Sequence, residues 1–147
     1  MHGVKHISIF AENKPGKIAS ITKVLAEGMI NILGMTIASS GSFGVIKFLV
    51  DDCEKAYRML KEKGFTVSVN DILAVEMADK PGGLSEIAQI LSEHGINIEY
   101  AYGLPIEPLK RAFLIAEVND IDRARSLLQN ESLRFLSEED IRKERTK

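Results

Sequence analysis

The stretch Asn13-Lys14-Pro15-Gly16 is the clearest indication of how this chain folds, because a near-identical stretch, Asp79-Lys80-Pro81-Gly82, follows 66 positions later. Ile30-Asn31-Ile32 returns as Ile96-Asn97-Ile98 with the same offset. Between the motifs, further positions match, namely Ile21 with Ile87, Leu25 with Leu91 and Glu27 with Glu93. Two motifs in one register indicate an internal duplication. We therefore expect domains over residues 1–70 and 71–136, followed by a charged helix or tail over 137–147.

In both halves, segments with alternating apolar residues and segments with apolar residues at a 3.6-residue period follow one another in the same order. The alternating segments predict strands, and the 3.6-residue period predicts helices. The first half predicts strand His6–Phe10, helix Gly16–Glu27, strands Ile32–Ala38 and Val45–Val50, helix Asp52–Lys63 and strand Phe65–Val69. The second predicts strand Ile72–Met77, a helix lined by Leu84, Ile87, Ala88 and Leu91, strands Ile98–Tyr102 and Ala112–Val118, helix Asp122–Gln129 and a short strand Arg134–Leu136. This βαββαβ order is that of the ferredoxin-like sandwich. The predicted fold class is α+β, with two such sandwiches whose antiparallel sheets carry helices on one face.

The two Pro-Gly turns are well suited to opening a helix. Their first residues are good N-caps, their prolines suit a first helical turn, and their glycines let a backbone or a ligand come close. The residues concerned are Asn13, Pro15 and Gly16 in the first half, and Asp79, Pro81 and Gly82 in the second. The unpaired N–H groups and positive dipole end of a helix N-terminus would favour a carboxylate. A single turn of this kind is more often an ordinary helix start than a ligand site.

Asn31 and Asn97 each stand between two isoleucines. Asparagine is depleted in strands, so its presence at the start of two predicted strands needs a reason. It could be the loop residue that precedes the strand. It could also use its side-chain amide, which both donates and accepts hydrogen bonds, to bind an α-amino or α-carboxylate group. The sequence leaves both interpretations open.

These paired motifs resemble the ACT domain family, and the resemblance extends over about residues 1–136. It implies a free-standing tandem ACT protein without a catalytic domain, which binds a free amino acid between ACT-like domains and acts on a metabolic enzyme. The ligand-binding residues that it implies are Asn13, Pro15, Gly16, Asn31, Ile32, Asp79, Pro81, Gly82, Asn97 and Ile98. Some serine-binding members carry a histidine two residues before the turn asparagine. Here Ala11 and Met77 occupy those positions, which favours an apolar amino acid.

An RNA-binding module is the alternative function, because its recognition fold has the same βαββαβ order. The stretch Gly41–Phe48 partly fits the third-strand signature of such modules. However, Gly41 stands where Lys or Arg is wanted, and Val45 stands where a base-stacking aromatic is wanted. The net charge of −2 also disfavours a nucleic-acid partner.

The sequence offers no catalytic or metal-binding constellation. His2, His6 and His94 are scattered and lack an acid or thiol at ligand spacing. Cys53 is the only cysteine, so no disulfide can form within the chain. No Gly-x-Ser-x-Gly turn or phosphate-binding glycine motif occurs. We therefore expect a regulatory protein rather than an enzyme, with no cofactor and no metal.

Location and assembly are also predicted. No stretch approaches the ~20 apolar residues of a membrane span, and the N-terminus lacks the apolar core of a signal peptide, so we expect a cytoplasmic protein without a membrane partner. Exposed sheet edges favour pairing into a homodimer. Asn70-Asp71 suggests a tight hairpin that pairs Phe65–Val69 with the strand beginning at Ile72. Ser137–Asp140 reads as a capping box before a helix over 141–147.

Overall fold

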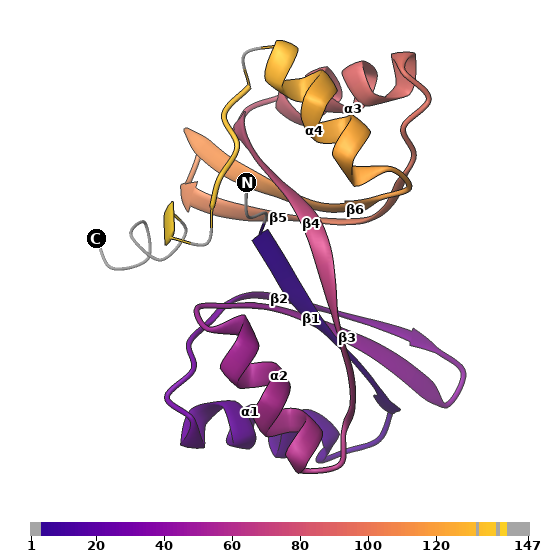
Figure 1. Ribbon diagram of the computed structural model, residues 1–147, viewed down its shortest axis with the longest axis vertical. Helices are drawn as coiled ribbons and strands as arrows, with labels where there is room; N and C mark the ends of the chain where they lie inside the picture. Colours follow the sequence, from indigo (N-terminus) through magenta and orange to yellow (C-terminus); the bar gives the residue numbers. More distant parts are fainter. Residues whose placement is uncertain (1–3, 132, 138, 141–147) are drawn as a thin grey trace. The chain divides into compact units, whose positions relative to one another are not determined.

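The computed structural model describes residues 4–131, 133–137 and 139–140. The chain divides into two compact units. The first unit is Lys5–Asn70, and the second holds Val4 and the chain from Asp71 onward. The elements, labelled in Figure 1, are β1 (Val4–Glu12), α1 (Lys17–Glu27), β2 (Ile32–Ser40), β3 (Phe43–Val50), α2 (Cys53–Glu62), β4 (Thr66–Ala78), α3 (Gly83–Glu93), β5 (Ile98–Glu107), β6 (Arg111–Val118) and α4 (Ile121–Asn130).

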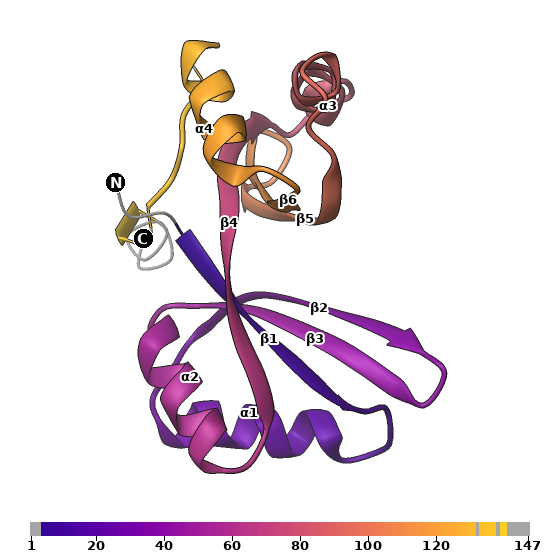
Figure 2. The ribbon, with the colours of Figure 1, turned by 45° about the vertical axis from the view of Figure 1, so that its right-hand side comes forward.

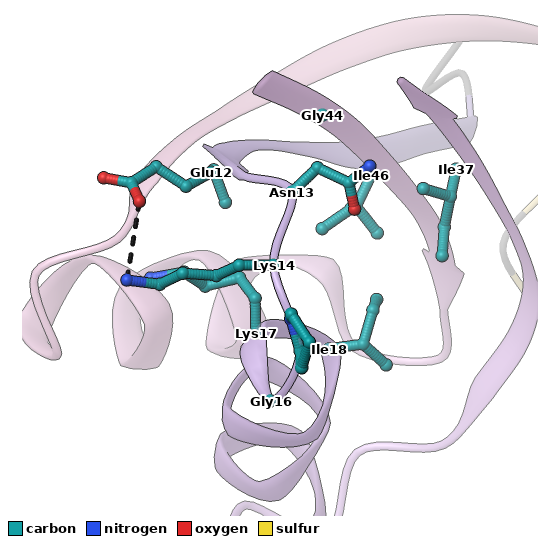
Figure 3. Close-up of a pocket in the computed structure, with 11 residues that line it drawn as sticks. Glu12, Asn13, Lys14, Gly16, Lys17, Ile18, Ile37, Gly44 and Ile46 are labelled. Carbon is teal, nitrogen blue, oxygen red and sulfur yellow. Dashed lines mark ion pairs between the residues drawn. The ribbon is translucent and has the colours of Figure 1, made fainter. Parts of the chain in front are cut away.

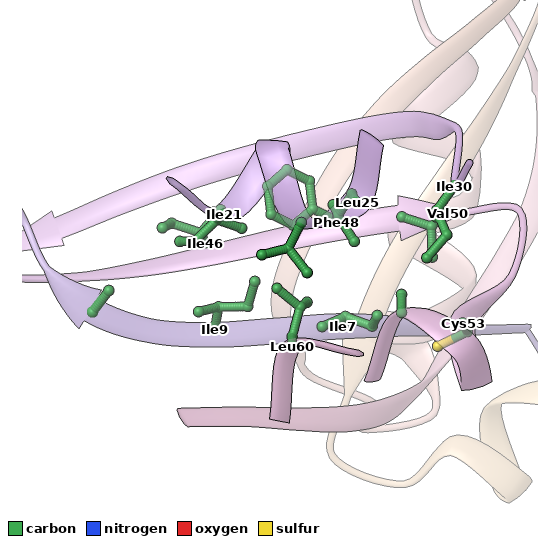
Figure 4. Packing of buried hydrophobic residues seen from close by; sticks show 13 residues of the cluster. Ile7, Ile9, Ile21, Leu25, Ile30, Ile46, Phe48, Val50, Cys53 and Leu60 are labelled. Atoms are coloured by element: carbon green, nitrogen blue, oxygen red, sulfur yellow. The ribbon is translucent and has the colours of Figure 1, made fainter. Parts of the chain in front are cut away.

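The first unit is a sheet covered by two helices on one face. Its strands lie in the order β4-β1-β3-β2, and β3 pairs antiparallel with both β1 and β2. Figure 2 shows α1 and α2 on the same face of β1, β2 and β3. The helices bury the faces that their periodicity predicts, which comprise Ile21, Val24 and Leu25 on α1 and Cys53, Ala56 and Leu60 on α2. These side chains meet Ile7, Ile9, Ile46 and Phe48 of the sheet in one core, drawn in Figure 4.

The second unit repeats this arrangement. Its strands lie in the order β4-β6-β5, and β6 pairs antiparallel with both neighbours. The short last strand predicted at Arg134–Leu136 is confirmed by an antiparallel bridge between Val75 and Phe135. Two backbone hydrogen bonds flank that bridge, from Glu76 N to Arg134 O (2.9 Å) and from Leu136 N to Ala74 O (3.0 Å). The two units therefore share one strand order, as a duplicated βαββαβ sequence requires.

The hairpin predicted at Asn70-Asp71 is wrong. β4 runs without interruption from Thr66 to Ala78, as Figure 1 shows. Its first part neighbours β1, and Phe65, Val67 and Val69 pack against the first core. The Ser8 hydroxyl donates a hydrogen bond to the Asn70 side-chain oxygen (2.9 Å), which holds this residue within the first sheet. A two-residue hairpin favours residues with positive φ, above all Asn-Gly, and no glycine follows Asn70.

The capping box predicted at Ser137–Asp140 is confirmed. Ser137 N donates to the Asp140 carboxylate (3.2 Å), and Asp140 N donates to the Ser137 hydroxyl (3.1 Å). The helix predicted over 141–147 lies outside the described residues. Within the described part of the chain, no helix is both long and apolar enough to cross a membrane.

Candidate functional site

Asn13 fixes the position of the first Pro-Gly turn, but it is not the N-cap of α1 as predicted. Its backbone N–H donates to the Ser42 carbonyl (2.8 Å), and its side-chain Nδ2 donates to the Ser39 hydroxyl (2.8 Å). Both bonds connect the turn to the β2–β3 hairpin. The N-cap is Gly16, which has a φ of 89° and no side-chain cap. Pro15 therefore precedes the N-cap rather than entering the first helical turn, and the left-handed φ explains why glycine occupies position 16.

The second turn is connected to its neighbouring hairpin in the same way, but through a charged residue, Asp79. Asp79 N donates to the Lys110 carbonyl (3.0 Å), and the Asp79 carboxylate accepts a hydrogen bond from Leu109 N (2.8 Å). Leu109 has a φ of 67°, so the carboxylate stabilises a backbone conformation that is unfavourable for leucine. Here too the predicted N-cap is wrong, because Gly82 caps α3 with a φ of 89°. Pro81 again lies before the cap.

A pocket of about 380 Å³ opens at the first turn. Its lining includes Asn13, Pro15 and Gly16, which the sequence analysis singled out. Figure 3 shows Ile18, Ile37 and Ile46 on one side of it and the charged side chains of Glu12 and Lys14 on the other. Ala11, Gly44 and Lys17 complete the lining. The pocket thus joins an apolar wall to a helix N-terminus, and it suits a small molecule with one apolar part and one anionic group.

The charged rim of the pocket carries a surplus of positive charge. Lys14 Nζ lies 3.4 Å from the Glu12 carboxylate, and both side chains are largely exposed. Lys17, in the first turn of α1, adds a second ammonium group to the lining. With one carboxylate and two ammonium groups, the rim favours an anionic group on a bound molecule.

Asn31 and Asn97 lie directly before β2 and β5, and their backbones make equivalent hydrogen bonds. Asn31 N donates to the Asp51 carboxylate (3.0 Å), and Asp51 N donates back to the Asn31 carbonyl (3.1 Å). Asn97 makes the same reciprocal pair with Asn119, at 3.0 and 3.2 Å. Both asparagine residues are exposed. The strand-entry role is therefore seen directly in their backbones, and the exposed side chains are available for a ligand.

The two motifs lie at opposite ends of the first sheet. Glu12, next to the turn, pairs with Phe43 at the start of β3, whereas Ile32 pairs with Val50 at its end. The length of β3 separates them by about 23 Å. Asn13 and Asn31 of one unit therefore cannot contact the same small molecule.

In the second unit, Asn97 and Ile98 line a separate open depression of about 430 Å³. The rest of its lining comes from the end of α3 and the loop that follows, and comprises Ala88, Leu91, Ser92, Gly95 and Ile96. Ile32 and Ile98 are each half-buried and pack against the core of their own unit. The ten predicted residues are thus brought together in groups, at the turns and at the strand entries, rather than in one place.

Sequence reasoning missed Gly83. A side chain at this position would place its Cβ 2.0 Å from the Ala78 carbonyl oxygen, so the start of α3 lies against the end of β4. The equivalent residue of the first half, by the offset of 66, is Lys17. The glycine pair Gly82-Gly83 was the available signal, since the second glycine has no counterpart in the first turn.

Tyr102 of β5 has an environment that changes the acidity of its phenol. It faces Ile115 across the β5–β6 pair, and Tyr100 faces Glu117 on the same strands. Burial raises the pKa of the Tyr102 phenol, and neighbouring Tyr100 and Glu117 raise this pKa further. Deprotonation of Tyr102 is therefore harder in the folded protein than in the unfolded chain.

This difference predicts a loss of stability at high pH. The unfolded chain releases the Tyr102 proton near the ordinary tyrosine pKa of about 10, while the folded chain retains it. The free energy of unfolding should then fall above about pH 10, by at most about 1.4 kcal/mol per pH unit for this one proton. Urea unfolding at several pH values should show a shallower fall for Tyr102→Phe than for the wild type. An unchanged slope in Tyr102→Phe, with Tyr57→Phe on α2 as the control, would contradict this expectation.

Among the described residues, no group of three His, Cys, Asp or Glu side chains is placed to hold a metal ion. Cys53 is buried in the first core, as its inward helix position predicts. The pocket at the Asn13–Gly16 turn combines an apolar wall with a helix N-terminus and therefore suits a small ligand.

Comparison with known proteins gives a match over nearly the whole chain. A family model described as an ACT domain pair matches residues 2–144. The crystal structure of protein BT0572 from Bacteroides thetaiotaomicron is 31% identical, with a TM-score of 0.88 and 95% of each chain covered. The ligand-free regulatory subunit of aspartate kinase from Thermus thermophilus is 21% identical, with a TM-score of 0.63 over 86% of this chain and 91% of that one. The last likeness concerns the fold alone. No curated protein matches the sequence.

Proposed function

This chain belongs to the ACT domain pair family, and we propose on that premise that it is a non-catalytic regulatory protein that binds a free amino acid. Membership confirms the resemblance and the α+β fold that the sequence predicted. The observation that carries the proposal is the pocket at the Asn13–Gly16 turn. The proposed domains are 1–70 and 71–136, with 137–147 appended. The proposed location is the cytoplasm, and the proposed target is a metabolic enzyme.

The pocket matches the two ends of an apolar amino acid. The α-carboxylate would lie at the start of α1, where helix N–H groups, the helix dipole and Lys17 all favour a negative charge. The side chain would lie against Ile18, Ile37 and Ile46. Ala11 contributes a small apolar surface and no hydrogen-bonding group, so the described lining offers more to an apolar side chain than to a hydroxyl.

We propose that a second copy of the chain completes the site. The asparagine amides that would bind the α-amino group are Asn31 and Asn97, and within the first unit Asn31 lies too far from the turn. β2 stands at the end of its strand order, and its side chains Met35 and Ile37 are 42% and 48% exposed. An edge strand with exposed apolar side chains favours pairing with another copy. The proposed binding residues are Asn13, Pro15 and Gly16 at the first turn and Asn31, Ile32, Asn97 and Ile98 at the strand entries, and Asp79, Pro81 and Gly82 are the counterparts of the first three at the second turn.

A thermal-shift screen of all protein amino acids tests the proposed function. A ligand at 100 times its Kd should add about 2.7 kcal/mol to the free energy of unfolding, which is readily seen as a higher Tm. We expect the largest shifts from apolar amino acids. The absence of any shift at millimolar concentrations, confirmed by calorimetry, would overturn the proposal.

Alanine substitution of the strand-entry asparagines should weaken binding. Losing a hydrogen bond to a charged ligand group costs about 1.5–3 kcal/mol, so Asn31→Ala or Asn97→Ala should raise the Kd roughly 10- to 100-fold. The Tm of the unliganded protein should change little, because the reciprocal bonds to Asp51 and Asn119 use the backbone. Asn130→Ala, at the exposed end of α4, is the control. Wild-type affinity in both single variants and in the double variant would mean that these asparagines serve only as strand-entry residues.

A further inference from the structure

The two units differ at the position equivalent to the pocket. Ala11 of β1 corresponds to Met77 of β4 by the offset of 66. Ile37 of β2 lies opposite Ile46, and Gly103 of β5 lies opposite Leu114, with both pairs at the same register of their sheets. Beside its turn, the first unit therefore has a small residue on β1 and a large one on β2, whereas the second unit has a large residue on β4 and a glycine on β5.

Met77 fills the equivalent space in the second unit. Its terminal methyl carbon lies 3.9 Å from the point where a Cβ of Gly103 would be. The residue opposite Met77 on the intervening strand is Ala112, whose short side chain lets the methionine extend across β6. Met77 also packs against the core that contains Leu73, Val75 and Leu114. In the first unit, the corresponding space between Ala11 and Ile37 is the pocket itself.

Two further differences at the second turn disfavour the binding of a ligand there. The start of α3 lies so near β4 that any side chain at Gly83 would collide with the Ala78 carbonyl, whereas α1 accommodates Lys17 at the same place. Asp79 differs from Asn13 in charge, although both side chains are bonded to the neighbouring hairpin. Its negative charge, beside the helix start, would also repel a ligand carboxylate, which the neutral Asn13 would not.

We infer that the second turn is a copy of the ligand site filled by its own Met77, so that each chain binds one amino acid, at the Asn13–Gly16 turn. The inference rests on the proposed function. It states that the residue at position 11 or 77 determines whether the neighbouring turn can bind a ligand. A small residue there leaves a pocket for the apolar side chain of a free amino acid. A methionine there occupies that place.

Calorimetric titration of the full chain with L-leucine, L-isoleucine and L-methionine tests the inference. The wild type should bind one molecule of the best of these per chain. Met77→Ala should open the second site and raise the stoichiometry toward two. Ala11→Met should close the first site and weaken binding at least about 10-fold. Met59→Ala removes a partly buried methionine far from both turns in sequence, and it should leave the stoichiometry at one.

The outcomes separate the inference from the function on which it rests. Two molecules bound per wild-type chain would overturn the inference and leave the proposed function intact. No binding to the wild type would overturn both. A folded Ala11→Met variant with wild-type affinity would also overturn the inference, and this arm decides the matter even where Met77→Ala does not fold. An unchanged stoichiometry in folded Met77→Ala would show that Met77 is not what closes the second turn.

Discussion

Phe48→Ala should lower the free energy of unfolding by about 3–5 kcal/mol, as large-to-small changes of buried aromatic residues do. Phe48 is fully buried in the second half of β3. Figure 4 shows it among Ile21, Leu25 and Ile46, so its removal would leave a cavity bounded by both the helix and the sheet. Urea unfolding followed by circular dichroism measures the change.

Phe43→Ala is the matched control for this substitution. Phe43 lies on the same strand but is 64% exposed, so the same truncation should change the unfolding free energy by less than about 1 kcal/mol. Similar losses in both variants would contradict the core as described, because burial is the property that distinguishes the two residues.

Gly83→Ala should destabilise the protein by about 3 kcal/mol, at the upper end of what overpacking usually costs. Its new Cβ would lie 2.0 Å from the Ala78 carbonyl oxygen, and this neighbour is backbone that cannot rotate away. The start of α3 would have to move away from β4. The cost exceeds the roughly 1 kcal/mol that alanine usually gains over glycine in a helix. Chemical unfolding measures this loss directly.

Lys17→Ala at the equivalent place of the first unit provides the comparison. Position 17 already carries a side chain at the start of α1, so the change should alter the unfolding free energy by less than about 0.5 kcal/mol. A Gly83→Ala variant as stable as the wild type would refute the close approach of α3 to β4, and with it one of the contacts that close the second turn.

The elements whose pattern is local could be predicted from the sequence. The buried faces of α1 and α2 follow from a 3.6-residue period, and the short strand Arg134–Leu136 follows from the repeat. Asn70-Asp71 shows where this reasoning fails. The pair favours a turn when considered alone, but β1 neighbours it in the sheet, and the strand supplies Val69 to the first core and Leu73 to the second, so it remains extended.

The candidate site was predictable only in part, because some of its residues come together through contacts between distant parts of the sequence. Asn13, Pro15 and Gly16 are adjacent in sequence, and they line the pocket. Ile37 and Ile46 reach it through the register of β2 and β3, which depends on pairing between distant residues. The N-cap assignments to Asn13 and Asp79 were wrong because both side chains bond the neighbouring hairpin instead. The role of the other predicted site residues stays a prediction.

Titration of isotope-labelled protein with apolar amino acids, followed by amide NMR, tests the central claim most directly. The account predicts saturable amide shifts for residues 11–14 and 16–18 and for Ile37 and Ile46, because these residues line the pocket and, unlike Pro15, carry an amide N–H. The same titration of Ala11→Met should leave those amides unshifted. Saturable binding that shifts only residues elsewhere in the chain, or no shifts at any concentration, would contradict the account.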